Sequence, residues 1–274
     1  DLWEQVNLIY VCSPGNPTGK VMSLADWKEL FELSDRHGFV IAADECYSEI
    51  YFPHPNPDGT TIQSTKPASG QVAGYLPLAG EGANVMPTTI NEGAPPLGAL
   101  TAAQQLGRNF KNLIVFNSLS KRSNVPGLRS GMVAGDAALI KAFLLYRTYH
   151  GSAMSPAVQA ASIAAWNDEA HVVDNRRQYA EKFAAVMPLL KDVLSFDAPD
   201  AAFYLWARVP GDDDAAFARG LYEREHLTVL PGSYLARDAA GVNPGKGFVR
   251  IALVDSLPAC IEAAARIVRF AGQV

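Results

Sequence analysis

The sequence is poor in cysteine and has no long apolar run. It holds three cysteines in 274 residues, at the widely separated positions Cys12, Cys46 and Cys260, and its five histidines do not cluster with them. These spacings fit neither a disulfide framework nor a zinc site, so we expect no metal, and reduced thiols in a cytoplasmic protein. No apolar stretch reaches the roughly 18 residues of a membrane span, and no signal-peptide pattern is seen. We therefore expect no membrane partner.

An excess of basic charge is also missing. Lysine and arginine total 23 against 28 acidic residues, a net charge of −5, which gives no reason to expect a nucleic-acid partner. The sequence lacks a Gly-x-Gly-x-x-Gly motif after a strand and a Walker-type Gly-Lys-Ser/Thr motif, which argues against a nucleotide-binding α/β domain. That alternative would also leave Lys121 and Asp44 without a role.

The most informative segment present is Ser118-Leu-Ser-Lys121. It follows the apolar run 113–117, whose β-branched and aromatic residues predict a buried strand. A lysine at the end of such a strand can be desolvated beside a crevice, which lowers its pKa and makes the amine a nucleophile toward a carbonyl. The alternative is an ordinary solvated loop lysine. Arg129 follows eight residues later.

Two further strand ends carry polar motifs. The apolar run 8–12 leads into Ser13-Pro-Gly-Asn-Pro-Thr-Gly19, in which two prolines and two glycines predict a rigid non-helical loop that fixes Asn16. The run 39–43 leads into Asp44-Glu-Cys-Tyr47. Because parallel α/β sheets bind ligands at the carboxyl ends of their strands, we expect Asp44 to face that crevice. A capping or turn aspartate is the alternative.

In this order, these motifs resemble those of the pyridoxal-phosphate (PLP) aminotransferases of fold type I, class I/II. The separations from Asn16 to Asp44 and from Asp44 to Tyr47 also resemble the family pattern, and the resemblance covers essentially the whole chain. It implies an α/β fold with a three-layer large PLP-binding domain and a mostly parallel sheet, followed by a smaller α+β C-terminal domain. We place the large domain at 1–165, and the connecting helix and small domain at 166–274.

Compared with the family pattern, we expect the N-terminal part of the large domain to be absent. The missing part includes the first strands of the sheet and a loop that helps to bind the cofactor phosphate. Residues 53–96 read as a loop insertion rich in proline, because Asp44 and Lys121 lie farther apart than the family pattern implies. The insertion is either a surface loop without a role, or a lid or oligomer contact.

Local patterns predict the remaining elements. Ser23 and Asp136 are suited to cap helices over 24–37 and 137–149. A helix is expected over 98–106, a short strand over 131–135, and a long helical stretch over 156–194 that is interrupted near Asp168. The C-terminal part should contain strands near 203–209, 228–230 and 248–253, with helices near 214–225 and 257–270.

The resemblance also implies the roles of individual residues. Lys121 would hold the cofactor through its amine and later move the substrate Cα proton. Asp44 would pair with the pyridinium nitrogen, and Asn16 and Tyr47 would hydrogen-bond the cofactor's phenolic oxygen. The phosphate would be bound by Ser118, Ser120 and Arg129, although Ser120 is also compatible with an ordinary turn serine.

Arg250 is the candidate for binding the substrate carboxylate, together with Asn16. It stands between apolar neighbours in Phe248-Val-Arg-Ile-Ala-Leu253, and the pattern alone also fits an arginine on the solvated face of a strand. Its distance from Lys121 resembles that of the family's carboxylate arginine. A guanidinium suits this task because its planar fork binds a carboxylate bidentately.

The expected activity is transfer of an amino group between glutamate and a 2-oxo acid, by a homodimer. Within the family, the motifs most resemble the bacterial N-succinyldiaminopimelate aminotransferases of lysine biosynthesis. The alternatives are another class I/II aminotransferase of the aspartate or alanine type, or a non-catalytic PLP-sensing domain of a transcription regulator. Aldolases, decarboxylases and racemases share the cofactor scaffold, so the fold does not decide the reaction.

Overall fold

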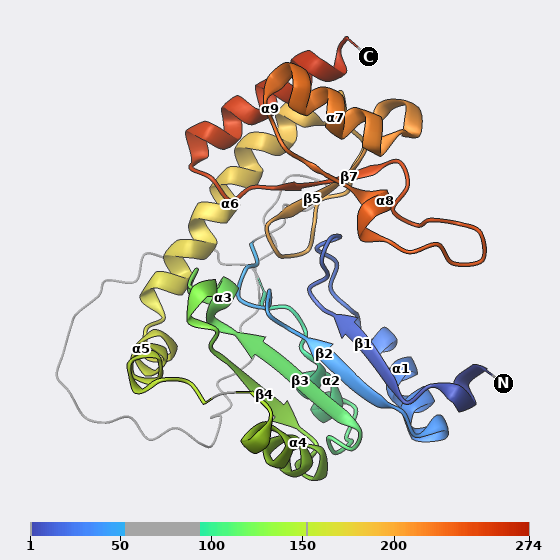
Figure 1. Cartoon of the computed structure of the whole chain (residues 1–274), viewed down its shortest axis with the longest axis vertical. Coiled ribbons are helices and arrows are strands. Elements are labelled where there is room, and N and C mark those ends of the chain that lie inside the picture. Colours follow the sequence, from blue (N-terminus) through green and yellow to red (C-terminus); the bar gives the residue numbers. More distant parts are fainter. Residues whose placement is uncertain (1, 53–93, 152, 274) are drawn as a thin grey trace.

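The computed structural model describes residues 2–52, 94–151 and 153–273. In these residues the chain forms two β-sheets, each with its own helices, and Figure 1 shows the smaller sheet above the larger one. The insertion expected at 53–96 lies outside the described residues, apart from 94–96. The domain boundary at 165/166 stays a prediction.

The larger sheet is mainly parallel. Its strands β1 to β4 lie side by side in sequence order; β1 pairs parallel with β2, β2 pairs parallel with β3, and β4 runs antiparallel to β3. The carboxyl ends of the first three strands therefore lie at one edge, as the resemblance implies. The strand bounds are β1 Leu8–Cys12, β2 Val40–Asp44, β3 Leu113–Ser118 and β4 Gly131–Gly135.

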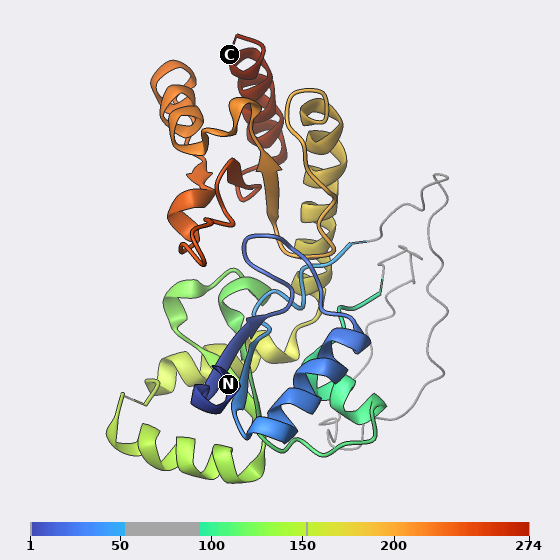
Figure 2. The ribbon, with the colours of Figure 1, turned by 90° about the vertical axis from the view of Figure 1, so that its right-hand side faces the viewer.

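Helices lie on both sides of this sheet, which gives the expected three layers. Helices α1 (Leu24–His37) and α2 (Ala99–Gln105) cover one face, and α4 (Ala137–Tyr149) lies on the opposite side (Figure 2). The first of these faces encloses a core that includes the fully buried Trp27 and Ile41. Burial of such large apolar side chains contributes about 1.5–3 kcal/mol each.

Helix boundaries follow from capping groups. Ser23 accepts a hydrogen bond from the Asp26 backbone N–H, the Asp26 carboxylate accepts one from the Ser23 backbone N–H, and α1 ends at Gly38 in the left-handed conformation. Asp136 accepts hydrogen bonds from the first turn of α4. Both predicted caps and the bounds of these two helices are confirmed.

The smaller sheet is antiparallel, with the order β5-β7-β6. The helices α6, α7 and α9 pack on it around a second core that includes Leu205, Leu221 and Ile267. Helix α6 starts beside α3, the helix that carries Lys121, and extends up to this sheet (Figure 1). The bounds are β5 Tyr204–Arg208, β6 Leu230–Pro231, β7 Phe248–Ala252, α3 Leu119–Arg122, α5 Pro156–Asn167, α6 Ala170–Leu190, α7 Asp214–Glu225, α8 Gly232–Leu235 and α9 Leu257–Ala271. Three short 3-10 turns cover Leu2–Gln5, Pro126–Leu128 and Pro210–Asp212.

A few predicted bounds differ from the structure. The strand expected from residue 39 begins at Val40, and the strand expected at 228–230 is the two-residue strand Leu230–Pro231. The helical stretch over 156–194 breaks near Asp168 as expected, but α6 ends at Leu190. Residues 191–193 form a turn there, which leads into the isolated bridge between Ser195 and Arg208.

Among the described residues, two backbone hydrogen bonds join the loops that follow β1 and β2 to the segment that leads into β5. The backbone N–H of Ala201 donates to the carbonyl of Gly19 at 3.0 Å, and that of Ala202 donates to the carbonyl of Ile50 at 2.8 Å. Gly19 has a φ of +68°, and a Cβ at this position would lie 2.6 Å from the Ala201 carbonyl oxygen, so glycine is required here. The loop that carries Asn16 is thus fixed against residues 199–201.

Candidate active site

The candidate site lies where three parallel strands end. Cys12 leads from β1 into the loop with Asn16, Asp44 is the last residue of β2, and Ser118 ends β3 and caps α3. The hydroxyl of Ser118 accepts a hydrogen bond from the Ser120 backbone N–H at 3.0 Å, so the chain turns directly from strand into the short helix that carries Lys121.

A pocket of about 440 Å³ opens at this edge. It brings together six of the eight predicted site residues, from three separate segments of the chain. Its lining includes Asp44, Tyr47, Ser118, Ser120, Lys121 and Arg129. Asn16 and Arg250 do not line it, but they contact each other nearby.

Asp44 is half-buried at the pocket. One of its carboxylate oxygens accepts a hydrogen bond from the Cys46 backbone N–H at 3.0 Å. Burial, with added repulsion from Asp44, raises the pKa of the Cys46 thiol to about 12. Cys46 is therefore a neutral thiol at pH 7, and Asp44 is the acidic side chain in the lining of the pocket.

Lys121 presents its ammonium to the pocket without an acidic partner among the described residues. The Nζ atom lies 5.3 Å from the centre of the Phe203 ring. A cation over an aromatic face gains a modest electrostatic attraction, but the lone pair of the neutral amine stays available for chemistry. Lys121 thus lies beside a pocket, the position expected for a lysine at the end of a buried strand.

Hydroxyls and a guanidinium gather at another part of the pocket. The hydroxyl of Ser118 donates to that of Ser120 at 2.7 Å, and Arg129 donates to the Pro126 carbonyl at 3.1 Å. Arg129 adopts a left-handed conformation with φ of 51°. Arg129 lines the same pocket as the two serines.

Asn16 and Arg250 meet across the two sheets. Arg250 donates from Nη1 to the Asn16 side-chain oxygen at 2.7 Å. The guanidinium of Arg250 lies 4.6 Å above the ring centre of Tyr204, in the neighbouring strand. The sequence pattern alone left open a solvated position for Arg250; in the structure Arg250 is half-buried and contacts the Asn16 amide and the Tyr204 ring, which come from different segments.

Tyr47 is buried, and its hydroxyl lies 2.9 Å from the hydroxyl of Tyr204. Burial, followed by the Tyr204 hydrogen bond, raises the pKa of Tyr47 above its ordinary value. Tyr47 is therefore a neutral phenol that can donate one hydrogen bond. Sequence reasoning missed Tyr204, because its place beside Arg250 depends on the pairing of β5 with β7.

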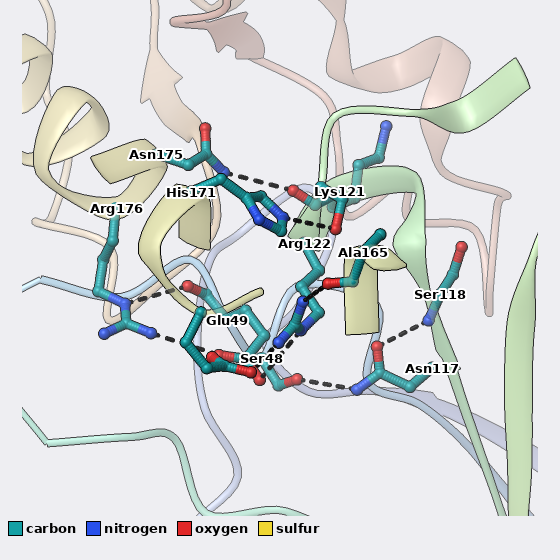
Figure 3. Close-up of polar contacts among 12 residues, drawn as sticks. Ser48, Glu49, Asn117, Ser118, Lys121, Arg122, Ala165, His171, Asn175 and Arg176 are labelled. Atoms are coloured by element: carbon teal, nitrogen blue, oxygen red, sulfur yellow. Dashed lines mark hydrogen bonds and ion pairs between the residues drawn. The ribbon is translucent and has the colours of Figure 1, made fainter. Parts of the chain in front are cut away.

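A cluster of ion pairs lies behind Lys121 (Figure 3); its two arginines are buried, whereas the carboxylates of Glu49 and Glu169 are 33% and 67% exposed. Arg122 donates to the Ala165 carbonyl at 2.9 Å and pairs with Glu169 and, at 4.0 Å, with Glu49. Arg176 of α6 reaches the same Glu49 at 3.3 Å. Sequence reasoning missed this cluster as well. The feature that could have indicated it is Arg122, a second cation directly after Lys121 in the short helix α3.

Two polar side chains of α6 also hold the segment around Lys121. Asn175 donates to the Lys121 carbonyl at 3.4 Å and accepts a hydrogen bond from Asn124 at 2.8 Å. His171 lies 2.8 Å from the Ser123 hydroxyl. The backbone on both sides of Lys121 is thus anchored, while its side chain is not.

The pocket chemistry fits PLP. That cofactor has an aldehyde, a ring nitrogen that pairs with a carboxylate, and a phosphate that hydroxyls and a guanidinium bind. The same pocket offers an amine, a carboxylate, and two serines with Arg129. Its wall is close-packed, because a Cβ on Gly131 would lie 2.5 Å from the Asn117 carbonyl oxygen. Fold and site together define an α/β protein with a lysine-centred site of the PLP type.

Comparisons with known proteins agree. Residues 2–267 match the family model described as aminotransferase class I and II, and the chain belongs to this family, whose cofactor is PLP. An aminotransferase crystal structure from Neisseria meningitidis superposes with a TM-score of 0.81 at 51% identity, over 98% of this chain and 58% of that one.

Two relatives with more specific names are more distant. A probable N-succinyldiaminopimelate aminotransferase from Thermus thermophilus has a TM-score of 0.69 and 28% identity, over 98% of this chain and 60% of that one. The LL-diaminopimelate aminotransferase of Dehalococcoides mccartyi is 28% identical over 92% of this chain and 53% of its own length. The chain thus spans a little over half the length of these relatives.

No described helix is both long enough and apolar enough to cross a bilayer.

Proposed function

We propose that this chain carries the lysine-bearing part of an aminotransferase that moves an amino group between glutamate and a 2-oxo acid. One observation carries the proposal: Lys121 lines the same pocket as Asp44 and the three candidate phosphate ligands, and no carboxylate of the described residues pairs with its ammonium. A free amine opposite a fixed carboxylate suits a group that must first bind a carbonyl and then carry a proton.

When bound, PLP supplies an electron sink for the negative charge that develops at the substrate Cα. The chain's own residues do the rest. Asp44 would hold the ring nitrogen, and Ser118, Ser120 and Arg129 would hold the phosphate. Lys121 would take the proton from the substrate Cα and deliver it to the carbon that was the cofactor's aldehyde carbon. Phe203 bounds the space around the Nζ atom.

Arg250 and Asn16 would orient the amino acid. The planar guanidinium can accept an α-carboxylate bidentately in place of its present hydrogen bond to Asn16. Tyr47, and Asn16 once released, are the donors offered to the phenolic oxygen of the cofactor. These roles support an α-amino acid as substrate, rather than an amine without a carboxylate.

For the acceptor we propose N-succinyl-2-amino-6-oxopimelate, with glutamate as donor. The motif resemblance supports this assignment, and so does the name of the Thermus thermophilus relative; the name of the Dehalococcoides mccartyi relative supports a diaminopimelate substrate without the succinyl group. An aspartate-type or alanine-type activity is the second candidate within the family.

A homodimer is part of the proposal. Helix α4 exposes large apolar side chains, with Leu144 at 66% and Tyr149 at 84% of their surfaces. A second copy that covers this helix would remove the apolar surface from water. The cytoplasmic location expected from the cysteines stays a prediction.

The test is to mix the purified chain with PLP, reduce it with borohydride and locate the modified peptide. Label on Lys121, with glutamate-dependent turnover of the succinylated acceptor above that of oxaloacetate and pyruvate, supports the full proposal. Label on Lys121 with faster turnover of oxaloacetate would overturn the acceptor assignment alone. Label elsewhere, or none, would overturn the lysine assignment.

A further inference from the structure

Tyr204 has no role in the chemistry described so far, yet it contacts two residues of the site. Its hydroxyl lies 2.9 Å from that of Tyr47, and its ring lies 4.6 Å below the Arg250 guanidinium. Only 5% of its surface is exposed. Tyr204 therefore connects the candidate partner of the cofactor with the candidate partner of the substrate.

The sheet fixes Tyr204 in this place. In the antiparallel pairing of β5 with β7, Trp206 is opposite Arg250 and Tyr204 is opposite Ala252, so Tyr204 and Arg250 are diagonal neighbours on one face. Phe203 and Tyr47 pack against the ring, with centroids at 4.4 and 5.7 Å. Little freedom remains for the ring, and the hydroxyl can rotate only about its own bond.

Each of the two phenols has one proton to donate, so one hydroxyl donates in the pair and the other accepts. If Tyr47 donates to Tyr204, its proton is not available to a ligand. If Tyr204 donates, Tyr47 accepts from one side and can donate its own proton on the other. The cation over the Tyr204 ring favours the second arrangement, because a nearby positive charge makes a phenol a stronger hydrogen-bond donor.

We propose that Tyr204 is a positioning residue that donates to Tyr47 and thereby directs the Tyr47 proton toward the phenolic oxygen of the cofactor. This inference rests on the proposed function. Consecutive hydrogen bonds polarise one another, so the Tyr47 donor is strengthened as well as oriented. A merely structural Tyr204 would pack the small sheet and leave the cofactor's proton affinity unchanged.

The test measures the pH midpoint of the visible absorbance change of PLP bound to the chain. A hydrogen bond donated to the phenolic oxygen favours the deprotonated chromophore and so lowers this midpoint. Tyr204→Phe keeps the ring under Arg250 and removes only the hydroxyl. We expect the midpoint to rise by about 0.3–1 pH unit, a two- to tenfold gain in proton affinity.

Three further variants isolate the effect. Tyr47→Phe should raise the midpoint more than Tyr204→Phe does, and the double variant should match Tyr47→Phe, because Tyr204 acts through Tyr47. Tyr179→Phe is the matched control: it removes the hydroxyl of another buried tyrosine of the same aromatic cluster, and this hydroxyl makes no hydrogen bond within the described residues. Its midpoint should equal that of the wild type. Tyr204→Leu should, in addition, raise the KM for glutamate, because it removes the ring beneath Arg250.

The sign of the shift decides the outcome. A midpoint that falls in Tyr204→Phe would mean that Tyr47 donates to Tyr204, and an unchanged midpoint would mean a packing role only; either result overturns the inference and leaves the proposed function intact. Additive shifts in the double variant would overturn it too. Absence of a visible cofactor band in the wild-type chain would instead overturn the proposed function and this inference with it.

Discussion

Lys121 and Arg122 are neighbours in one short helix, yet their surroundings are opposite. Figure 3 shows the two side chains pointing away from each other. Arg122 is 3% exposed, pairs with Glu49 and Glu169, and lies 5.0 Å over the ring of Trp166. Lys121 faces the pocket, and within the described ranges its ammonium meets an aromatic ring and no carboxylate.

This difference shows that a reactive side chain can lack an ion-pair partner while hydrogen bonds hold its backbone in place. The side-chain amide of Asn175 donates to the Lys121 carbonyl. The next residue, Arg122, donates to the Ala165 carbonyl in α5 and pairs with Glu169 at the start of α6. A paired Lys121 would keep its proton and lose reactivity. An unpaired Arg122 would be a buried charge without compensation. Substitutions at Lys121, Glu49 and Arg250 test whether paired and unpaired cations differ in this way.

The largest expected effect concerns Lys121→Ala. Turnover should fall by at least about 1,000-fold, because the amine both binds the carbonyl and carries the proton. The free energy of unfolding should change by less than about 0.5 kcal/mol, since no ion pair is lost. Activity assays and urea unfolding of the same preparation check both parts.

Lys246→Ala is the matched control for this change. Lys246 lies exposed in the segment before β7, does not line the pocket, and its loss should leave turnover and stability near wild type. Appreciable turnover in folded Lys121→Ala protein would show that Lys121 is not the reacting amine, and that the two neighbouring cations differ only in packing.

The second prediction addresses the anchored side. Glu49→Gln removes a charge shared by Arg122 and Arg176, two nearly buried cations. We expect a loss of about 1.5–3 kcal/mol in the free energy of unfolding, because two buried guanidinium groups lose a shared carboxylate that is itself 33% exposed. Denaturant unfolding measures it.

Glu32→Gln provides the comparison. Glu32 pairs with Lys28 on the surface of α1, where both side chains are more than half exposed, so its loss should cost less than about 0.5 kcal/mol. Equal losses of unfolding free energy in Glu49→Gln and Glu32→Gln would mean that the ion pairs behind Lys121 do not hold its backbone in place.

Arg250→Lys tests the substrate side with a smaller effect. The charge remains but the planar fork is lost, so the apparent affinity for glutamate should weaken by about 1–3 kcal/mol. PLP affinity should stay unchanged. Arg208→Lys, an exposed arginine on β5 paired with Asp212, is the control. A variant that lost cofactor affinity and kept substrate affinity would make Arg250 a structural residue.

Much of the large sheet could be predicted from sequence because its signals are local. The apolar runs before Asn16, Asp44 and Ser118 are strands, and the caps at Ser23 and Asp136 begin helices as expected. Parallel pairing then brings the carboxyl ends of these strands together. For this reason, six site residues chosen from motifs line one pocket.

Tyr204 and Glu49 could not be found in the same way. Tyr204 is one aromatic residue in an apolar strand, and its contact with Arg250 depends on the register between β5 and β7. Glu49 becomes a shared partner only when α6 brings Arg176 to Arg122. These contacts join residues 46 to 127 positions apart, and a single sequence carries no signal for such pairings.

The smallest expected effect concerns Asp213 and Asp214 at the start of α7. It tests whether a hydrogen-bonded, buried charge and an exposed charge differ there as well. Asp214 is 3% exposed and accepts hydrogen bonds from the backbone of Ser233 and Gly247 and from the Ser233 hydroxyl. Burial alone would raise the pKa of Asp214, but these hydrogen bonds outweigh it and hold the pKa below its ordinary value. Asp213 is exposed and caps α7.

Because the pKa of Asp214 is lower in the folded chain than in the unfolded one, its contribution to stability is present above about pH 4 and is lost as the pH falls through the folded value. Asp214→Asn should therefore cost about 1–2 kcal/mol at pH 7, and the cost should shrink below about pH 4 and be lost as the pH falls through the lowered pKa of the folded carboxyl. Asp213→Asn should cost little at any pH, because asparagine also caps helices well. A series of unfolding measurements from pH 7 down to about pH 2 separates the two aspartates. If the loss of unfolding free energy in Asp214→Asn did not change with pH, the shape of the Asp214 side chain would matter there and its charge would not.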